Sequence, residues 1–438
     1  MAELWPFKGY RYSIENPDDL GSLISPPYDM LDKPSIDLLY RKSDLNAVRI
    51  DQNRTESTDT ANIDRHIRAA ALFADWTTKG FVKRETTPSL YVYKQQFEAE
   101  QAGVWKRIER TGIISLVKLV DFGVGSGAVL PHEYTLSGPK VDRYEHLSAT
   151  RLNTGQIFGL LDDETGDIFR LIRSIKNNAP LGTGTDADGV RHTLYICSDP
   201  ILISRFQAAA RDCTILIADG HHRYETALKF YRDQNCDPAC GGVMMTLVST
   251  ADPGLVIRSF HRLIRKNVID RTIDFKRELS RYFTLTDLGA ANRSLIDSFL
   301  QGAPSATMLF VDSGLKTGFA CSLNAYGETF LQASMQDRSA DWRHLDTSII
   351  NAVAIGGILG LPLDGNVLHD TVEYMNDTGA ALGLSLDDSA FHGGFFIKPV
   401  TFTTIHRIVA GGERMPQKST NFFPKLYSGL VYNRLEAQ

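Results

Sequence analysis

Residues 214–232 read TILIADGHHRYETALKFYR and carry the strongest structural and chemical signals in the chain. The first five residues form a short apolar run rich in β-branched side chains, which predicts a strand. Residues 219–223 predict a turn, and apolar side chains then recur at helical spacing over 224–232. The stretch therefore predicts a strand that passes through a tight turn into a helix.

The predicted turn has the chemistry of an anion site. Gly220 lets the backbone turn sharply and approach a ligand closely. The first N–H groups of the following helix lack partners within the helix, and the helix dipole adds a partial positive charge. Arg223, His221 and His222 add donors, which together predict a phosphate-binding turn. Asp219 is predicted either to hold Mg²⁺ beside the phosphate or to cap the helix. In the alternative interpretation of the whole turn, Asp219 is only a cap, Arg223 forms a surface ion pair and the two histidines are solvated.

Length and composition exclude several classes of protein. The 438 residues predict two or three domains, and 43% hydrophobic with 23% charged residues is a globular balance that excludes general disorder. The net charge of -5 argues against a nucleic-acid coat. Five cysteines, no apolar run of ~20 residues and no signal-peptide pattern at the N-terminus predict a cytoplasmic protein without a membrane segment.

Helix and strand signals alternate along the whole chain. Helical spacing is found in residues 62–79, 200–210, 274–282, 292–300, 347–359 and 403–409. Strand patterns are found in residues 89–97, 111–120, 241–248, 255–264, 306–311, 318–323 and 394–399. A Gly-rich turn is expected at 123–127 and a polar loop at 131–143. This order predicts an α/β or α+β fold, a mixed sheet with flanking helices, divided near residue 270 into regions 1–270 and 271–438.

An acid and an imidazole stand side by side at His132 and Glu133. Glu133 is predicted to be a general base for a hydroxyl substrate or a Mg²⁺ ligand; an ordinary surface glutamate is the alternative. The pair is not a His-Glu-x-x-His metalloprotease motif, because Leu136 stands where the second histidine belongs. Lys140 and Arg143 downstream predict either a phosphate clamp or a solvated turn.

The basic segment near the C-terminus resembles a P-loop but does not satisfy its pattern. Gln417 stands where the second glycine belongs, and Pro424 would interrupt the helix that follows a P-loop. A P-loop is therefore rejected. The segment still supplies phosphate donors, with a solvated loop as the alternative: Lys418, Ser419, Thr420 and Lys425.

A rigid proline segment, SPPYD, occupies residues 25–29. The second proline restricts the residue before it to extended backbone. The segment is predicted either to present Tyr28 and Asp29 to a pocket or to form a structural turn.

The motifs occur in an order that resembles one family. ADGHHRYETA at 218–227, SPPYD at 25–29, PHEYT at 131–135, DPGL at 252–255 and MPQKST at 415–420 resemble the domain-of-unknown-function 1015 family, whose name implies no activity. The DGHHR box is also similar to that of the ParB/sulfiredoxin superfamily, which includes nucleotide-dependent free-serine kinases. That likeness implies a ParB/sulfiredoxin-like core with large additional segments, and a turn that holds nucleotide phosphates. His221 stands where sulfiredoxins have a reactive cysteine, so their chemistry is not implied.

We therefore expect a nucleotide-dependent phosphotransferase without a P-loop that acts on a small hydroxylated, serine-like metabolite, with ATP or ADP and Mg²⁺. The expected catalytic residues are Glu133, His132, Asp219 and His222. The expected nucleotide-binding residues are Gly220, His221, Arg223, Lys140, Arg143, Lys418, Ser419, Thr420 and Lys425. Tyr28 and Asp29 are expected to contact the substrate, and Asp219 and Glu133 the metal.

Two alternatives belong to other classes. One is a ParB-like nucleotide- or nucleic-acid-binding protein, which the net charge and the absence of a basic helix-turn-helix pattern disfavour. The other is a metal-dependent hydrolase with His132, Glu133, His221 and His222 as ligands.

Overall fold

The computed structural model describes residues 3–60, 63–101, 104–125, 128–135, 137–175, 179–266, 268, 273–304, 307–363 and 365–436. The chain forms two compact units. The first contains Met1–Pro131, Thr135–Val256 and Pro424–Gln438, and the second contains His132–Tyr134 and Ile257–Phe423. The main division thus follows Val256 instead of residue 270, and the last segment of the chain returns to the first unit. The expected break at Asp270 lies outside the described residues, as do expected element ends at Asn62 and Ala306 and part of the turn at 123–127.

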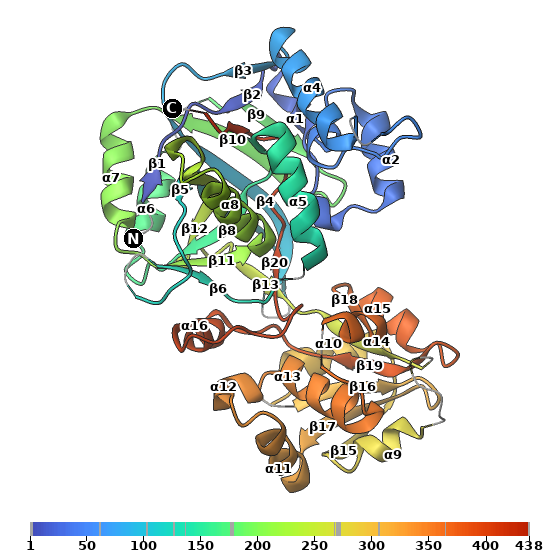
Figure 1. Ribbon diagram of the computed structural model, residues 1–438. Helices are drawn as coiled ribbons and strands as arrows, with labels where there is room; N and C mark the ends of the chain where they lie inside the picture. Colours follow the sequence, from blue (N-terminus) through green and yellow to red (C-terminus); the bar gives the residue numbers. More distant parts are fainter. Residues whose placement is uncertain are drawn as a thin grey trace. The chain divides into compact units, whose positions relative to one another are not determined.

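Within its described residues, the first unit is built on a mixed nine-stranded sheet (Figure 1). The strand order is β6-β11-β8-β12-β5-β4-β10-β9, with β1 (Leu4–Trp5) beside β5. β11 pairs in parallel with β6 and antiparallel with β8, and β12 pairs in parallel with β8 and antiparallel with β5. The bounds are β4 Leu90–Gln101, β5 Val104–Lys118, β6 Val129–Pro131, β8 Ile157–Leu161, β9 Gly182–Thr185, β10 Arg191–Cys197, β11 Ile215–Asp219 and β12 Gly242–Ser249.

The first unit also contains helices, some of which pack apolar side chains against the sheet. The longer ones are α2 Lys33–Lys42, α4 Arg65–Thr78, α5 Ser137–Thr150, α6 Asp167–Ser174, α7 Pro200–Ala210 and α8 His221–Asp233. Buried side chains of β5, β8, β11 and β12 form one core with Ile172 of α6, Phe206 of α7 and Tyr224 of α8. The burial of these side chains fixes the position of α8 at the end of β11, which places the DGHHR turn at the edge of a rigid core.

The second unit has its own sheet within the described residues, six strands in the order β15-β17-β16-β19-β14-β18 with antiparallel pairs (Figure 1). The strands are β14 His261–Arg265, β15 Phe283–Ala290, β16 Thr307–Asp312, β17 Thr317–Leu323, β18 Val372–Met375 and β19 Phe391–Phe396. Along β16, Phe310 joins one core while Leu309 and Val311 join another. This period of two shows that both faces of the sheet are covered.

The helices of the second unit complete these cores. They are α9 Phe275–Leu279, α10 Arg293–Gly302, α11 Ala325–Ser334, α12 Ala340–Arg343, α13 Asp346–Ile350, α14 Gly365–Thr371, α15 Thr378–Ser385 and α16 Phe402–Ala410. The helix expected over 347–359 is present, but its second half, Asn351–Leu359, is a π-helix. No helix in the described part of the chain is long and apolar enough to cross a membrane.

The mixed α/β class expected from the sequence is confirmed, and three local expectations are wrong. The turn expected over 219–223 is only Gly220, because β11 ends at Asp219 and α8 begins at His221. The loop expected over 131–143 instead contains the first residues of α5. A proline is tolerated in the first turn of a helix, because backbone N–H groups there have no partner within the helix. The single strand expected over 255–264 is two strands, β13 (Val256–Arg258) and β14.

Candidate functional site

The connection between β11 and α8 is the single residue Gly220. Its φ of 92° is a left-handed conformation that favours glycine. Gly220 occupies the N-cap position and has no side chain with which to cap the helix, so Asp219 is not the cap. The positive end of the α8 dipole therefore lies at this turn.

Asp219, the last residue of β11, joins two cations. Its carboxylate accepts a hydrogen bond from Arg223 Nη2 at 2.9 Å and from Lys425 Nζ at 2.7 Å. Burial would raise the pKa of Asp219, but the charges of Lys425 and Arg223 outweigh it and hold the pKa well below its ordinary value. Two cations on one carboxylate leave this trio with one positive charge.

Arg223 has a donor that the protein leaves unused. Nη1 donates to the backbone oxygen of Gln156, and Nη2 to Asp219. Nε is buried and has no hydrogen-bond partner within the described part of the chain. A Cβ built on Gly220 would lie 3.1 Å from Nε, so this nitrogen borders the turn. A buried guanidinium N–H without a partner is costly, and an anion at the turn would relieve that cost.

Other residues singled out from the sequence surround this turn within the first unit. Tyr28 lies in a short 3₁₀ helix, Tyr28–Met30, and the Arg143 guanidinium lies 4.3 Å from its ring centroid. Burial, with the charge of Asp29, raises the pKa of Tyr28 to about 12. Burial lowers the pKa of His222, and the Asp29 carboxylate opposes this. The electrostatic neighbours of Arg223 include both Tyr28 and Asp29. The proline segment and the DGHHR turn are therefore close together.

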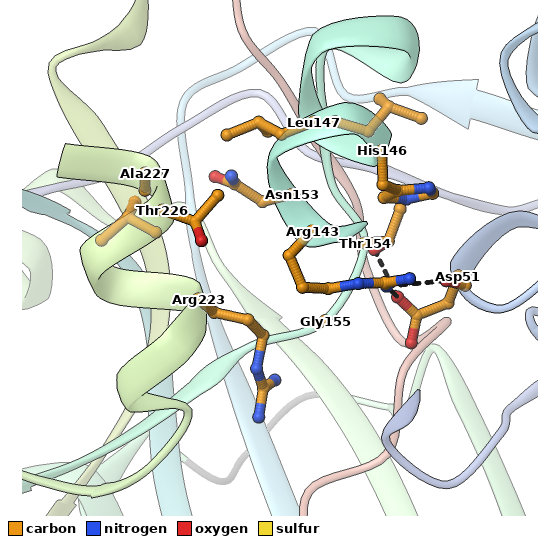
Figure 2. Close-up of a pocket in the computed structure, with 12 residues that line it drawn as sticks. Asp51, Arg143, His146, Leu147, Asn153, Thr154, Gly155, Arg223, Thr226 and Ala227 are labelled. Atoms are coloured by element: carbon orange, nitrogen blue, oxygen red, sulfur yellow. Dashed lines mark hydrogen bonds and ion pairs between the residues drawn. The ribbon is translucent and has the colours of Figure 1, made fainter. Parts of the chain in front are cut away.

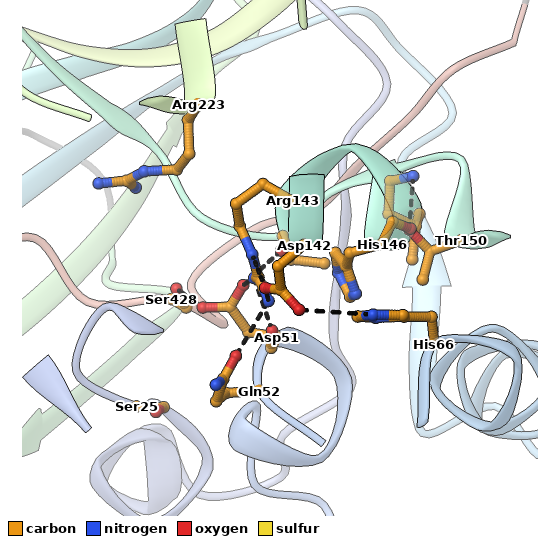
Figure 3. Close-up of polar contacts among 12 residues, drawn as sticks. Ser25, Asp51, Gln52, His66, Asp142, Arg143, His146, Thr150, Arg223 and Ser428 are labelled. Carbon is orange, nitrogen blue, oxygen red and sulfur yellow. Dashed lines mark hydrogen bonds and ion pairs between the residues drawn. The ribbon is translucent and has the colours of Figure 1, made fainter. Parts of the chain in front are cut away.

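Lys140 and Arg143 both lie on α5, and both are engaged by the protein. Lys140 Nζ donates to Glu225 Oε2 at 2.8 Å. Arg143 is only 5% exposed and donates to the Asp51 backbone oxygen at 2.9 Å, to Gln52 Oε1 at 2.9 Å and to Asp142 Oδ2 at 2.6 Å, as Figure 3 shows. Arg143 thus holds α5 against the segment at residues 51–52, and these bonds would have to break before it could bind phosphate.

His132 and Glu133 are grouped with residues of the C-terminal basic segment in the second unit. Glu133 Oε1 accepts from the Ser419 N–H at 3.1 Å and from the Thr420 hydroxyl at 3.4 Å. His132, 1% exposed, has its Nε2 2.7 Å from Thr420 Oγ1. Lys418 is exposed, with Nζ 5.3 Å from the Phe260 ring centroid. His132 and Glu133 of the first motif therefore meet the motif at 415–420 within this unit.

The site residues expected from the sequence are thus divided between the two units. The first unit holds Tyr28, Asp29, Lys140, Arg143, Asp219, Gly220, His221, His222, Arg223 and Lys425, and the second holds His132, Glu133, Lys418, Ser419 and Thr420.

The described residues do not offer a ready-made metal centre. They include no group of three or more histidine, cysteine or acidic side chains arranged to hold a metal ion. Asp219 is already neutralised by two cations, and Glu133 belongs to the other unit. The expected Mg²⁺ ligands therefore do not form a common site in either unit.

Sequence analysis missed several polar residues around the turn. Asp51 is buried and accepts from the hydroxyls of Thr154 at 2.6 Å and Ser428 at 2.7 Å. Gln156 supplies the oxygen that fixes Arg223. Neither lies in a recognisable motif, and Ser428 is 377 residues from Asp51 in the chain, so no local pattern identifies these contacts.

Comparison with solved structures finds distant likenesses of fold. A conserved hypothetical protein from Pyrococcus furiosus is 12% identical, with 70% of this chain and 94% of that chain covered and a TM-score of 0.32. A mutant of free serine kinase in complex with ADP is 12% identical, with 69% and 88% covered and a TM-score of 0.32. SbnI with a C-terminal truncation, from Staphylococcus aureus, is 12% identical, with 72% and 85% covered and a TM-score of 0.34. At this identity the likenesses concern the fold alone.

Comparison with curated proteins finds no match. The model of one family, described as "Protein of unknown function (DUF1015)", matches residues 4–348. The matched stretch includes the DGHHR turn and residues 131–135, and it ends before the basic segment at 415–425. The chain therefore belongs to the DUF1015 family of proteins of unknown function.

Proposed function

We propose that this protein is a nucleotide-dependent phosphotransferase without a P-loop, and that the Gly220 turn holds the phosphate groups of ATP or ADP. The observation that carries the proposal is the buried Arg223 Nε, which borders the turn without a partner in the described structure. The helix dipole and the surplus positive charge of the trio formed by Asp219, Arg223 and Lys425 support it. Together these features support the binding of an anion at the turn.

The reaction that suits such a site is transfer of the terminal phosphoryl group to a hydroxyl. The hydroxyl oxygen of the acceptor would form a bond to the terminal phosphorus while the bond from phosphorus to the leaving nucleotide oxygen breaks. Catalysis of this step depends mainly on positioning and on neutralising charge. The hydroxyl proton must go to a base, because the cations that hold phosphate cannot accept a proton, and Glu133 is the candidate that the sequence offers for this role.

As expected from the sequence, the proposed acceptor of the phosphoryl group is a small hydroxylated metabolite such as free serine. Tyr28 and Asp29, which approach Arg223 and His222, are the residues that we assign to its recognition. Because the described residues offer no ready-made metal centre, no step is assigned to Mg²⁺.

The proposal is tested by incubating the purified protein with ATP or ADP, with and without Mg²⁺, and a panel of hydroxylated amino acids, sugars and polyols. Phosphorus NMR should show loss of the terminal nucleotide phosphate and a new phosphate ester that depends on one class of acceptor. Inorganic phosphate as the sole product would indicate hydrolysis and overturn the transfer reaction. Absence of nucleotide consumption with every acceptor would also overturn it.

A further inference from the structure

A pocket lies in the first unit between α5, α8 and residues 152–155 (Figure 2). Its volume is about 40 Å³. One water molecule needs ~10–15 Å³ by this measure, so the pocket accommodates about three non-hydrogen atoms. Arg143 and His146 line it from α5, and Arg223 and Thr226 line it from α8. The pocket therefore has room for one small chemical group, such as a hydroxymethyl group.

Besides Arg223 Nε, which borders the Gly220 turn, two buried polar atoms of lining residues have no hydrogen-bond partner among the described residues: His146 Nε2 and Thr226 Oγ1. Each side chain belongs to a residue that is 4% exposed. Leaving such groups unpaired destabilises a protein by ~1–3 kcal/mol each. The pocket is therefore polar at two points that the protein itself does not satisfy.

The unpaired hydroxyl of Thr226 is unusual for a helical threonine. Such hydroxyls commonly donate to the carbonyl oxygen four residues earlier. Thr77, Thr150 and Thr371 each do so in this structure, at 2.9, 2.7 and 2.6 Å. Thr226 makes no such bond, although it lies in a helix and lines the pocket. Its hydroxyl is therefore buried and unpaired at a residue that lines the pocket.

The charged side chains that line the pocket already have ion-pair partners. Arg143 Nη2 is paired with Asp142 Oδ2, and Arg143 Nη1 lies 3.6 Å from Asp51 Oδ1. Arg223 is paired with Asp219. Burial, together with the charge of Arg143, lowers the pKa of His146 well below its ordinary value, so its imidazole is neutral at neutral pH. The surplus positive charge of Asp219, Arg223 and Lys425 is assigned to the phosphates at the Gly220 turn. Beside Thr226 and the neutral His146, a neutral hydroxyl, which can both donate and accept, therefore fits better than a charged group.

The geometry points to a binding site for the uncharged, hydroxyl-bearing end of a small molecule, with Thr226 and His146 as its hydrogen-bond partners. Arg223 lines this pocket and also borders the Gly220 turn, so an occupant would lie next to the phosphates. The occupant is then the phosphoryl acceptor, an identification that rests on the proposed function. The structure thereby specifies that this end of the acceptor carries a hydroxyl and no charge.

The test measures binding of three probes to the full chain by ligand-observed NMR, without nucleotide. The probes are ethylene glycol as the neutral hydroxyl compound, formate as the anion and methylammonium as the cation. Thr226→Val removes the hydroxyl at nearly constant shape. Thr111→Val is the matched control, because Thr111 Oγ1 is also buried and without a partner in the described chain but is not part of the pocket lining.

Ethylene glycol should bind to wild type and to Thr111→Val, and about fivefold or more weakly to Thr226→Val, because one hydrogen bond is lost. A second variant, Ala227→Val, narrows the pocket without removing a polar group and should also weaken binding. Equal binding of ethylene glycol to wild type and Thr226→Val, binding of formate or methylammonium that is tighter and depends on Thr226, or no ethylene glycol binding to wild type would overturn the inference.

A parallel titration with ATP separates this inference from the proposed function. Binding of ethylene glycol that depends on Thr226, without any binding of ATP, would support the pocket and contradict the phosphotransferase. Binding of ATP without binding of ethylene glycol would overturn the pocket alone.

Discussion

At the residue scale, Gly220 determines whether the turn can bind an anion. Gly220→Ala should lose most of the affinity for ATP, because the new Cβ would crowd Arg223 Nε and Nη2 at 3.1 Å at the point where phosphate would bind. Gly189→Ala is a matched control: Gly189 also has a positive φ, of 78°, but a Cβ there would meet no atom within 4 Å. Calorimetric titration with ATP should show near wild-type affinity for this control. Equal affinities in both variants would contradict the assigned role of the turn.

Glu133 is the residue on which the proposed chemistry depends. Glu133→Gln keeps an oxygen that can accept from the Ser419 N–H and the Thr420 hydroxyl, so the second unit should remain folded. Turnover should fall by ~10²–10⁴-fold, because an amide cannot take up the hydroxyl proton. Affinity for ATP should stay within about twofold, since no positive charge at the turn changes. Full activity of this variant, measured by phosphorus NMR, would eliminate Glu133 as the base.

The sequence predicts the residue types of the turn but not all of its partners. Gly220 and Arg223 follow from a strand–turn–helix pattern within a few residues, so local reasoning reaches them. The pairing of Asp219 with Lys425 joins positions 206 residues apart and depends on how the chain returns to the first unit. For the same reason, the sequence suggested a phosphate clamp at Arg143, whereas the structure shows it bound to Asp142 and the segment at residues 51–52.

At the scale of elements, helices with a clear apolar period were predictable, whereas α5 was not. Residues 137–150 begin with SGPK, which favours a loop when read locally, and the apolar stripe that follows is short. Leu147 is buried against Phe230 of α8, so tertiary packing stabilises α5 where local propensity does not. The π-helix Asn351–Leu359 has the apolar composition of an ordinary buried helix, and the sequence pattern therefore does not distinguish the two.

The C-terminal segment is an element of the first unit, which yields a stability prediction. Tyr432 is fully buried, packs against Tyr12 and Phe73, and exchanges backbone hydrogen bonds with Tyr10. Tyr432→Ala should lower the free energy of unfolding by ~3–5 kcal/mol, the range for large aromatic truncations in cores. Tyr326→Ala, at a residue that is 50% exposed, should cost much less. Urea unfolding followed by fluorescence gives both values, and a loss for Tyr432→Ala as small as that expected for Tyr326→Ala would show that the segment adds little stability.

At the scale of the whole molecule, buried histidines make stability depend on pH. Burial is the largest cause of lowered pKa values at His66, His146, His192, His222, His261 and His392. The pKa values of His261 and His392 fall to about 4. The unfolded chain takes up these protons near pH 6.5 and the folded chain only at lower pH, so folding stability is lost as the pH falls below about 6.5.

Two buried carboxyls act in the opposite direction. Burial raises the pKa of Asp252, and it raises that of Asp346 to about 6, so these groups favour the folded state as the pH falls from about 6 to 4. The histidines are more numerous, and the net loss between pH 7.5 and 5.5 should be about 2 kcal/mol. Melting temperatures measured across this range should therefore decrease. A constant or rising melting temperature would contradict the neutral state assigned to these histidines.

The organisation into two units was only partly predictable. A mixed α/β chain with a break in the middle follows from composition and periodicity, but the return of residues 424–438 to the first unit depends on long-range contacts such as those of Tyr432. His132–Tyr134 belong to the second unit because of long-range contacts as well. One of these is the hydrogen bond that the Met415 N–H donates to the His132 carbonyl oxygen at 2.7 Å. Sequence periodicity carries no information about such distant pairings.

The central claim is that Arg223 binds nucleotide phosphate at the Gly220 turn, and calorimetric titration with ATP tests it most directly. Arg223→Gln removes the charge and the unpartnered Nε, whereas Lys229→Gln removes a charge from an exposed position on the same helix. Loss of a charge-assisted hydrogen bond of ~1.5–3 kcal/mol should weaken binding about 10- to 150-fold in Arg223→Gln. Lys229→Gln should bind ATP like the wild type. Equal affinity of the two variants for ATP, or no binding of ATP to the wild type, would contradict the account.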